Sequence, residues 1–149
     1  MAQGDAPKID LIRRFSSDAH AILLATAGFW EGVDVRGPNL RCVIIDRLPF
    51  ASPDDPLERA RRQNVQQNGG NYFLEYALPE AVIALRQGVG RLIRDEHDRG
   101  IVMIGDRRLQ THSYGRAFLN SLPPMSVHTN MELLRNYLPQ TSQTDRARQ

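Results

Sequence analysis

The chain of 149 residues is long enough for one domain with a hydrophobic core, and its 41% apolar and 24% charged residues are typical of a globular protein. A formal net charge of +2 excludes a strong overall field that would attract DNA or RNA. The single cysteine, Cys42, excludes an internal disulfide and any all-cysteine metal or iron–sulfur site within the chain. Because neither a signal-peptide pattern nor a membrane-length apolar run is present, we expect a cytoplasmic protein without a membrane partner.

The predicted elements begin after a polar, aperiodic start. Residues 1–6 and 139–149 are expected to be a disordered start and a flexible tail, with one folded domain over 7–138. The spacing of apolar residues predicts a short helix from Pro7 to Phe15. Three apolar runs have the length of strands: Ala21–Ala25, Cys42–Ile45 and Ile101–Ile104.

Strands that are apolar on both faces are typical of a parallel sheet buried under helices, and Cys42 is then inert packing within one of them. Helices are predicted at 55–67, 79–94, 114–122 and 131–138. This alternation favours an open α/β sheet, whose working loops follow the carboxyl ends of the strands. Those loops are 26–37, 46–55 and 105–108.

The helix predicted from Pro79 to Arg94 presents a polar stripe. Gln87, Gly90, Arg91 and Arg94 are spaced i, i+3, i+4 and i+7 and therefore share one face. Guanidinium groups in this arrangement suit a transferring phosphoryl group. The alternative is a solvated arginine face paired with the following acids, Asp95, Glu96 and Asp98. The opposite face is apolar and suited to a sheet: Ala81, Val82, Leu85, Val89, Leu92 and Ile93.

The glycine-rich loop 26–37 has the composition of a phosphate-contacting segment. Its glycines allow close approach of a ligand, and the Thr26 hydroxyl could hold a nucleic-acid phosphate. Phe29 and Trp30 have two interpretations, packing or base stacking. Asp34 is either a turn-stabilising side chain or a ligand.

Other signals of a complete nucleotide site are absent from the sequence. There is no Gly-x-x-x-x-Gly-Lys-Ser/Thr phosphate loop and no acidic box for magnesium, so a nucleoside triphosphate would need a second half-site elsewhere. The four histidines lack ligand spacing, and we assign no metal site.

These segments resemble superfamily 2 helicases. Phe29–Gly37 (FWEGVDVRG) is similar to motif V and Gln87–Arg94 (QGVGRLIR) to motif VI. Val43–Phe50 (VIIDRLPF) and Ser52–Pro56 (SPDDP) resemble the iron–sulfur branch that contains the DinG, YoaA and XPD helicases, and YoaA-type proteins in particular. The resemblance runs from Pro7 to Leu138.

The resemblance implies a fold and a role. The fold is a RecA-like open parallel sheet flanked by helices, the P-loop NTPase-like second motor domain, here without a strand before Pro7 and so with an exposed sheet edge. The role is the carboxyl-terminal motor domain of an ATP-dependent helicase that moves 5′ to 3′ on DNA. Implied partners are the first motor domain of the same polypeptide and single-stranded or forked DNA.

The resemblance also implies site residues and cofactors. Arg91, Arg94 and Gln87 are the implied catalytic residues. ATP and Mg²⁺ would be bound mainly by the first motor domain, which would also hold a four-cysteine 4Fe–4S cluster. The remaining implied ATP-site residues are Gly90, Glu31, Gly32 and Asp34, and the implied DNA-binding residues are Thr26, Phe29 and Trp30.

Two other classes of function stay open from the residues alone. One is a shortened, non-catalytic binding module of the same fold. The other is an unrelated nucleotide-binding α/β domain whose arginine helix grips a phosphate metabolite, which the Trp30-Glu31-Gly32 segment argues against. Whether the frame upstream of Met1 encodes a phosphate loop and four cysteines discriminates between the first class and a helicase domain.

Overall fold

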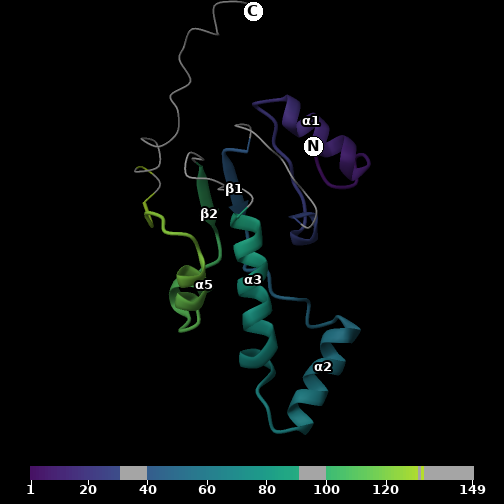
Figure 1. The fold of residues 1–149 in the computed structure, drawn as a ribbon, viewed down its shortest axis with the longest axis vertical. Coiled ribbons are helices and arrows are strands. Elements are labelled where there is room, and N and C mark those ends of the chain that lie inside the picture. Colours follow the sequence, from purple (N-terminus) through teal and green to yellow (C-terminus); the bar gives the residue numbers. More distant parts are fainter. Residues whose placement is uncertain (31–39, 91–99, 131, 133–149) are drawn as a thin grey trace, which may run out of the picture.

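The computed structural model describes residues 1–30, 40–90, 100–130 and 132. Figure 1 shows its elements arranged around one upright central helix, α3. In chain order the elements are α1 (Lys8–Ser17), the 3₁₀ helix η1 (Ala27–Trp30), β1 (Cys42–Ile45), α2 (Pro56–Gln67), the π-helix η2 (Phe73–Ala77), α3 (Leu78–Val89), β2 (Ile101–Ile104), α4 (Arg108–Thr111) and α5 (Gly115–Ser121).

The two strands lie side by side and run parallel, with Cys42 opposite Ile101 and Ile45 opposite Ile104. Both have the bounds predicted from their apolar runs. The connection from β1 to β2 passes through α2 and α3, as a parallel pair requires a long crossover. The α/β class is therefore confirmed, with a two-stranded parallel sheet in the described part of the chain.

The core lies where α3 meets the strands and α5. Ala81, Leu85 and Val89 recur at intervals of four residues and are buried on one face of α3. They pack with Ile45 at the end of β1 and with Phe118 of α5. The amphipathic pattern of this helix thus predicts its buried face correctly within the described residues.

Local chemistry sets where the helices begin. The Asp55 carboxylate caps α2 by accepting hydrogen bonds from the amides of Leu57 at 2.8 Å and Glu58 at 3.4 Å. α3 follows η2 without a break, although its start is predicted at Pro79. Since Pro79 has no amide hydrogen, the turn before it widens, and the Leu78 amide donates to the Phe73 carbonyl.

The strand predicted at Ala21–Ala25 is wrong. This segment makes one isolated bridge, from Leu24 to Ala2, and the side chains of Ile22 and Leu24 are exposed. An apolar run becomes a strand only where a neighbouring strand offers backbone partners, and Ala2 supplies a single pairing position.

The prediction that the strands are buried on both faces is also wrong for β1. Ile45 is buried, but Ile44 is 70% exposed and Cys42 is exposed as well. Because alternate strand residues point to opposite faces, one face of β1 packs on the core and the other is uncovered in the described structure. The expectation that Cys42 is packed inside a buried strand is therefore wrong.

The start of the chain, predicted to be loose, has fixed backbone contacts. The amide of Gln3 donates to the Leu24 carbonyl at 2.8 Å, and the amide of Leu24 donates to the Met1 carbonyl at 3.0 Å. Gly4 makes the turn that follows, with a φ of 105° that favours glycine. These bonds hold residues 1–6 beside 22–26.

Candidate functional site

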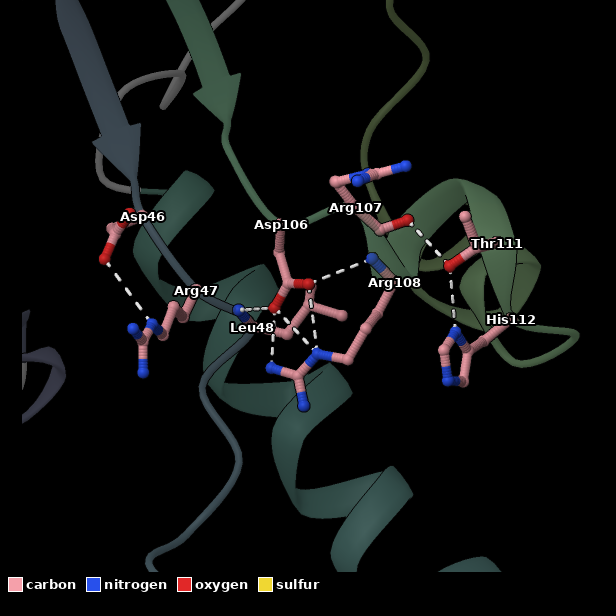
Figure 2. Close-up of polar contacts among 8 residues, drawn as sticks. All are labelled: Asp46, Arg47, Leu48, Asp106, Arg107, Arg108, Thr111 and His112. Atoms are coloured by element: carbon pink, nitrogen blue, oxygen red, sulfur yellow. Dashed lines mark hydrogen bonds and ion pairs between the residues drawn. The ribbon is translucent and has the colours of Figure 1, made fainter.

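The loops after β1 and β2 are joined to each other. The Asp106 carboxylate, at the end of β2, accepts a hydrogen bond of 2.9 Å from the backbone amide of Leu48, after β1 (Figure 2). The Gly105 amide also donates to the Ile45 carbonyl at 2.9 Å. A Cβ on Gly105 would lie 3.3 Å from the Asp46 carbonyl oxygen, so the two loops approach closely here. The carboxyl ends of both strands thus meet, as predicted.

Asp106 is held on its other side by Arg108. The Arg108 guanidinium donates to both carboxylate oxygens, from Nε at 3.0 and 3.1 Å and from Nη2 at 2.6 Å. The Asp106 side chain is only 7% exposed. The bonds from Arg108 hold the pKa of Asp106 well below its ordinary value, and the same pairing raises the pKa of Arg108. We call Leu48, Asp106 and Arg108 the strand-end joint.

The acid at the corresponding place after β1 behaves differently. The Asp46 side chain is 94% exposed, and its ion pair with Arg47 is 3.7 Å long. An exposed pair of this kind contributes little to stability. The strand-end joint therefore depends on the Asp106 carboxylate, and the Asp46 carboxylate takes no part in it.

The strand-end joint continues into a group of aromatic side chains. The Arg108 guanidinium lies 5.3 Å from the centre of the Phe50 ring, a cation–π contact. Phe50 stacks on Phe73 with ring centres 5.9 Å apart and meets Phe118 edge to face at 5.7 Å. The orientation of the Phe50 ring is thus set by charge on one side and by the core on another.

A pocket of about 530 Å³ opens beside Phe50. It lies between the loop after β1, the end of α2 and η2, and its volume is within the range of small-molecule sites. The lining residues combine aromatic rings, amides and one arginine: Phe50, Ala51, Ser52, Arg62, Gln66, Gly70, Asn71, Tyr72, Phe73 and Ala77.

A polar clamp fixes α2 next to this pocket. The buried Glu58 carboxylate accepts a hydrogen bond from the Tyr72 hydroxyl and pairs with Arg61 at 3.1 Å. Arg61 also pairs with Glu80 of α3 at 3.2 Å. The Arg62 guanidinium lies 5.1 Å from the Tyr72 ring centre. The hydrogen bond to Glu58 raises the pKa of Tyr72.

The polar stripe of the central helix is described in part. Gln87 is exposed on the last turn of α3, and Gly90 caps that turn, donating its amide to the Arg86 carbonyl at 2.8 Å. Arg91 and Arg94 lie outside the described residues.

The loop that begins at Thr26 is likewise described only at its start. Thr26 is exposed, and its hydroxyl donates to the Gln3 side-chain oxygen at 3.0 Å. Phe29 is 6% exposed, with the Lys8 ammonium 5.0 Å from its ring centre. A ring this buried offers no free face to a base, so burial supports the packing interpretation of Phe29 and argues against the stacking one.

Trp30 ends η1. The other site residues predicted in this loop, Glu31, Gly32 and Asp34, lie outside the described residues. A Cβ on Gly28 would meet no atom within 4 Å, so the space beside that glycine is open. A second pocket, of about 240 Å³, lies between η1, α1 and the start of the chain.

The described starts of the two predicted motif segments lie on neighbouring elements. η1, where the loop starts, contacts α3, which carries Gln87 and ends at the capping residue Gly90. Sequence reasoning placed working loops after each strand but assigned no role to Asp106, Arg108 or the Phe50 pocket. An acid and an arginine two residues apart, directly after a strand, were the available signal for the strand-end joint.

Two kinds of site are not found in the described part of the chain. No group of three or more His, Cys, Asp or Glu side chains is placed there to hold a metal ion. None of the helices described is both long and apolar enough to cross a bilayer.

Comparison with known proteins gives consistent matches. A family model described as the helicase C-terminal domain matches residues 1–125. The ATP-dependent DNA helicase YoaA of Escherichia coli is 56% identical over 124 residues, which are 83% of this chain and 20% of that protein. YoaA of Haemophilus influenzae is 52% identical over 93% of the chain and 22% of its own length. The ATP-dependent helicase DinG of Mycobacterium tuberculosis is 43% identical over 97% and 22%. The chain thus spans about a fifth of these relatives.

Proposed function

We propose a function from one established fact: the chain belongs to the helicase C-terminal domain family, in its DinG/YoaA-type branch. In our proposal it is the second, RecA-like motor domain of an ATP-dependent DNA helicase. It supplies one wall of an ATP site whose other wall belongs to the first motor domain of the same polypeptide.

One observation carries this proposal. η1, which includes the first residues of the motif V-like segment, contacts α3, whose last turn includes the first residues of the motif VI-like segment. A DNA-contacting loop and a nucleotide-contacting helix that touch each other can pass a change at one site to the other. The joined carboxyl ends of β1 and β2 support the same assignment, because open α/β sheets bind ligands at that edge.

The proposed roles follow the charge that develops on a transferred phosphoryl group. Arg91 and Arg94 stabilise the γ-phosphate, and Gln87 orients the attacking water. Gly90 lets the nucleotide approach the helix closely. Glu31, Gly32 and Asp34 link the nucleotide cleft to the DNA track.

DNA binding is proposed for Thr26 and Trp30, and Phe29 is left out because its ring is buried. ATP and Mg²⁺ are held mainly by the first motor domain, since this sequence has no phosphate loop. One cysteine cannot supply the four thiolates of a 4Fe–4S cluster, so no cluster is assigned to this chain.

The shared ATP site is tested by measuring ATP hydrolysis by the purified 149-residue chain and by a protein that joins it to a first motor domain. We expect no turnover from the chain alone, with or without single-stranded DNA, and DNA-stimulated turnover from the joined protein. Turnover by the isolated chain would contradict a shared site. A joined protein that binds ATP but never hydrolyses it would contradict the motor assignment.

A further inference from the structure

We propose that the pocket beside Phe50 binds one unstacked base of a single-stranded nucleic acid. The inference rests on the proposed function and adds a base-binding subsite that is distinct from the motif V-like loop. It is carried by the aromatic wall, the amide groups and the charge of the pocket.

The wall of the pocket suits a flat ring. Phe50 and Phe73 stack with their planes 28° apart, and Phe73 remains 36% exposed. Aromatic side chains that lie at a pocket and are partly open are the usual platforms for unpaired bases, because every base has a π-face. Such a platform can hold a strand whatever its sequence.

The polar groups around this wall suit the edge and the backbone of a nucleotide. Gln66 and Asn71 bring side-chain amides, which both donate and accept hydrogen bonds as base edges do. Arg62 brings a positive charge, and no carboxylate is among the lining residues. The positive charge of Arg62 favours a ligand that carries phosphates over a purely apolar one.

The pocket is also held in shape from both sides. On one side, Phe50 is fixed by Arg108, which is itself held by Asp106. On the other, Tyr72 is fixed by its hydrogen bond to the buried Glu58. A platform whose supports are locked loses little conformational freedom when a base binds. Because Asp106 joins the strand ends, a base in the pocket contacts the same edge of the sheet that faces the ATP site in our proposal.

The test couples one side chain to one base. Affinity of the 149-residue chain is measured for a single-stranded oligodeoxynucleotide and for a series in which each base in turn is removed to leave an abasic site. We expect one position whose abasic form binds about fivefold to 150-fold more weakly, the range for loss of one stacked base. In Phe73→Leu, which keeps apolar packing but removes the ring, the same abasic site should cost nothing further.

Matched controls separate the pocket from the general surface. Leu74→Ala removes another exposed apolar side chain of η2 that does not line the pocket, and it should keep the parental abasic profile. Gln66→Ala should weaken binding of the intact oligonucleotide, whereas Gln63→Ala, on the same helix outside the pocket, should not. Gln66 and Gln63 are both exposed, so we expect both alanine variants to fold. This pair therefore tests the pocket even if Phe73→Leu folds poorly.

The outcomes are distinct. An abasic penalty that is unchanged in Phe73→Leu, or no measurable binding of the oligonucleotide, overturns the base pocket. The motor proposal fails separately, when the joined protein shows no DNA-stimulated ATP hydrolysis although the coupling between one base and Phe73 is present.

Discussion

The Asp106 carboxylate and the Leu48 backbone amide form a 2.9 Å hydrogen bond that joins the loops after the two parallel strands. The same carboxylate receives the Arg108 guanidinium, and that guanidinium lies over the Phe50 ring. One buried acid therefore sets the geometry of the strand ends and of the wall of the adjacent pocket.

Replacing Asp106 by alanine should lower the free energy of unfolding by about 1.5–3 kcal/mol at neutral pH, as for a hydrogen bond to a charged group. The amide of Leu48 and the Arg108 guanidinium would both lose their acceptor. Chemical denaturation with linear extrapolation measures the change. Asp46→Ala, at an exposed acid after the other strand, should change stability by less than about 0.5 kcal/mol.

The contribution of Asp106 should also depend on pH. Its pKa is lowered in the folded protein, so the stability it adds is fully present above the pKa of the unfolded chain, about 3.9. It is lost as the pH falls below that value towards the folded pKa. The difference in stability between the parent and Asp106→Asn should therefore shrink as the pH falls below about 4. A constant difference over that range would show that Asp106 does not act through its charge.

Tyr72→Phe should destabilise the protein by about 1.5–3 kcal/mol at neutral pH, because the buried Glu58 carboxylate loses the Tyr72 hydroxyl and keeps only Arg61 as a side-chain donor in the described part of the chain. The folded pKa of Tyr72 is raised, so its contribution is present below the unfolded pKa of about 10 and is lost as the pH rises through the folded pKa. Unfolding curves at neutral and alkaline pH measure both effects. Tyr76→Phe, which alters an exposed tyrosine of the same segment, is the control and should leave stability unchanged at neutral pH.

Arg91→Ala or Arg94→Ala, in the chain joined to a first motor domain, should reduce ATP turnover by at least about 10²-fold while sparing affinity for single-stranded DNA. Loss of one charge-stabilising donor in the transition state costs about 2.7–4 kcal/mol, and arginine fingers are worth about 10³–10⁵ in rate. Steady-state hydrolysis and DNA binding are measured on the same preparations. Arg86→Ala removes an exposed arginine of α3 that precedes the motif VI-like segment, and this variant should hydrolyse ATP normally. Parental turnover in either of the first two variants would refute the finger assignment for that residue.

Asp34→Asn in the joined protein should leave ATP hydrolysis without DNA nearly unchanged and remove most of its stimulation by DNA. The reason is the position of Asp34 in the segment that links the DNA track to the nucleotide cleft in our proposal. Turnover with and without single-stranded DNA measures the ratio. Full stimulation in the variant would favour the turn-stabilising role instead.

Much of the local structure could be predicted because short-range chemistry controls it. The apolar runs of β1 and β2, the helix predicted at 55–67 and the buried face of α3 all depend on residues within a turn or a strand of one another. The strand predicted at Ala21–Ala25 was wrong because a strand also needs a partner from elsewhere, and its hydropathy says nothing about that partner.

By itself, the sequence determined the family, through two motifs whose residue types and spacing suit phosphate chemistry, and the parallel pairing of two apolar strands. Only the tertiary structure decided that Asp106 rather than Asp46 joins the strand ends, that Phe29 is packed inside and that Phe50 and Phe73 stand together beside a pocket. These are contacts between residues far apart in the sequence. The Asp106 carboxylate joins the strand ends because it is buried and meets the Leu48 amide, and both conditions arise only when the chain is folded.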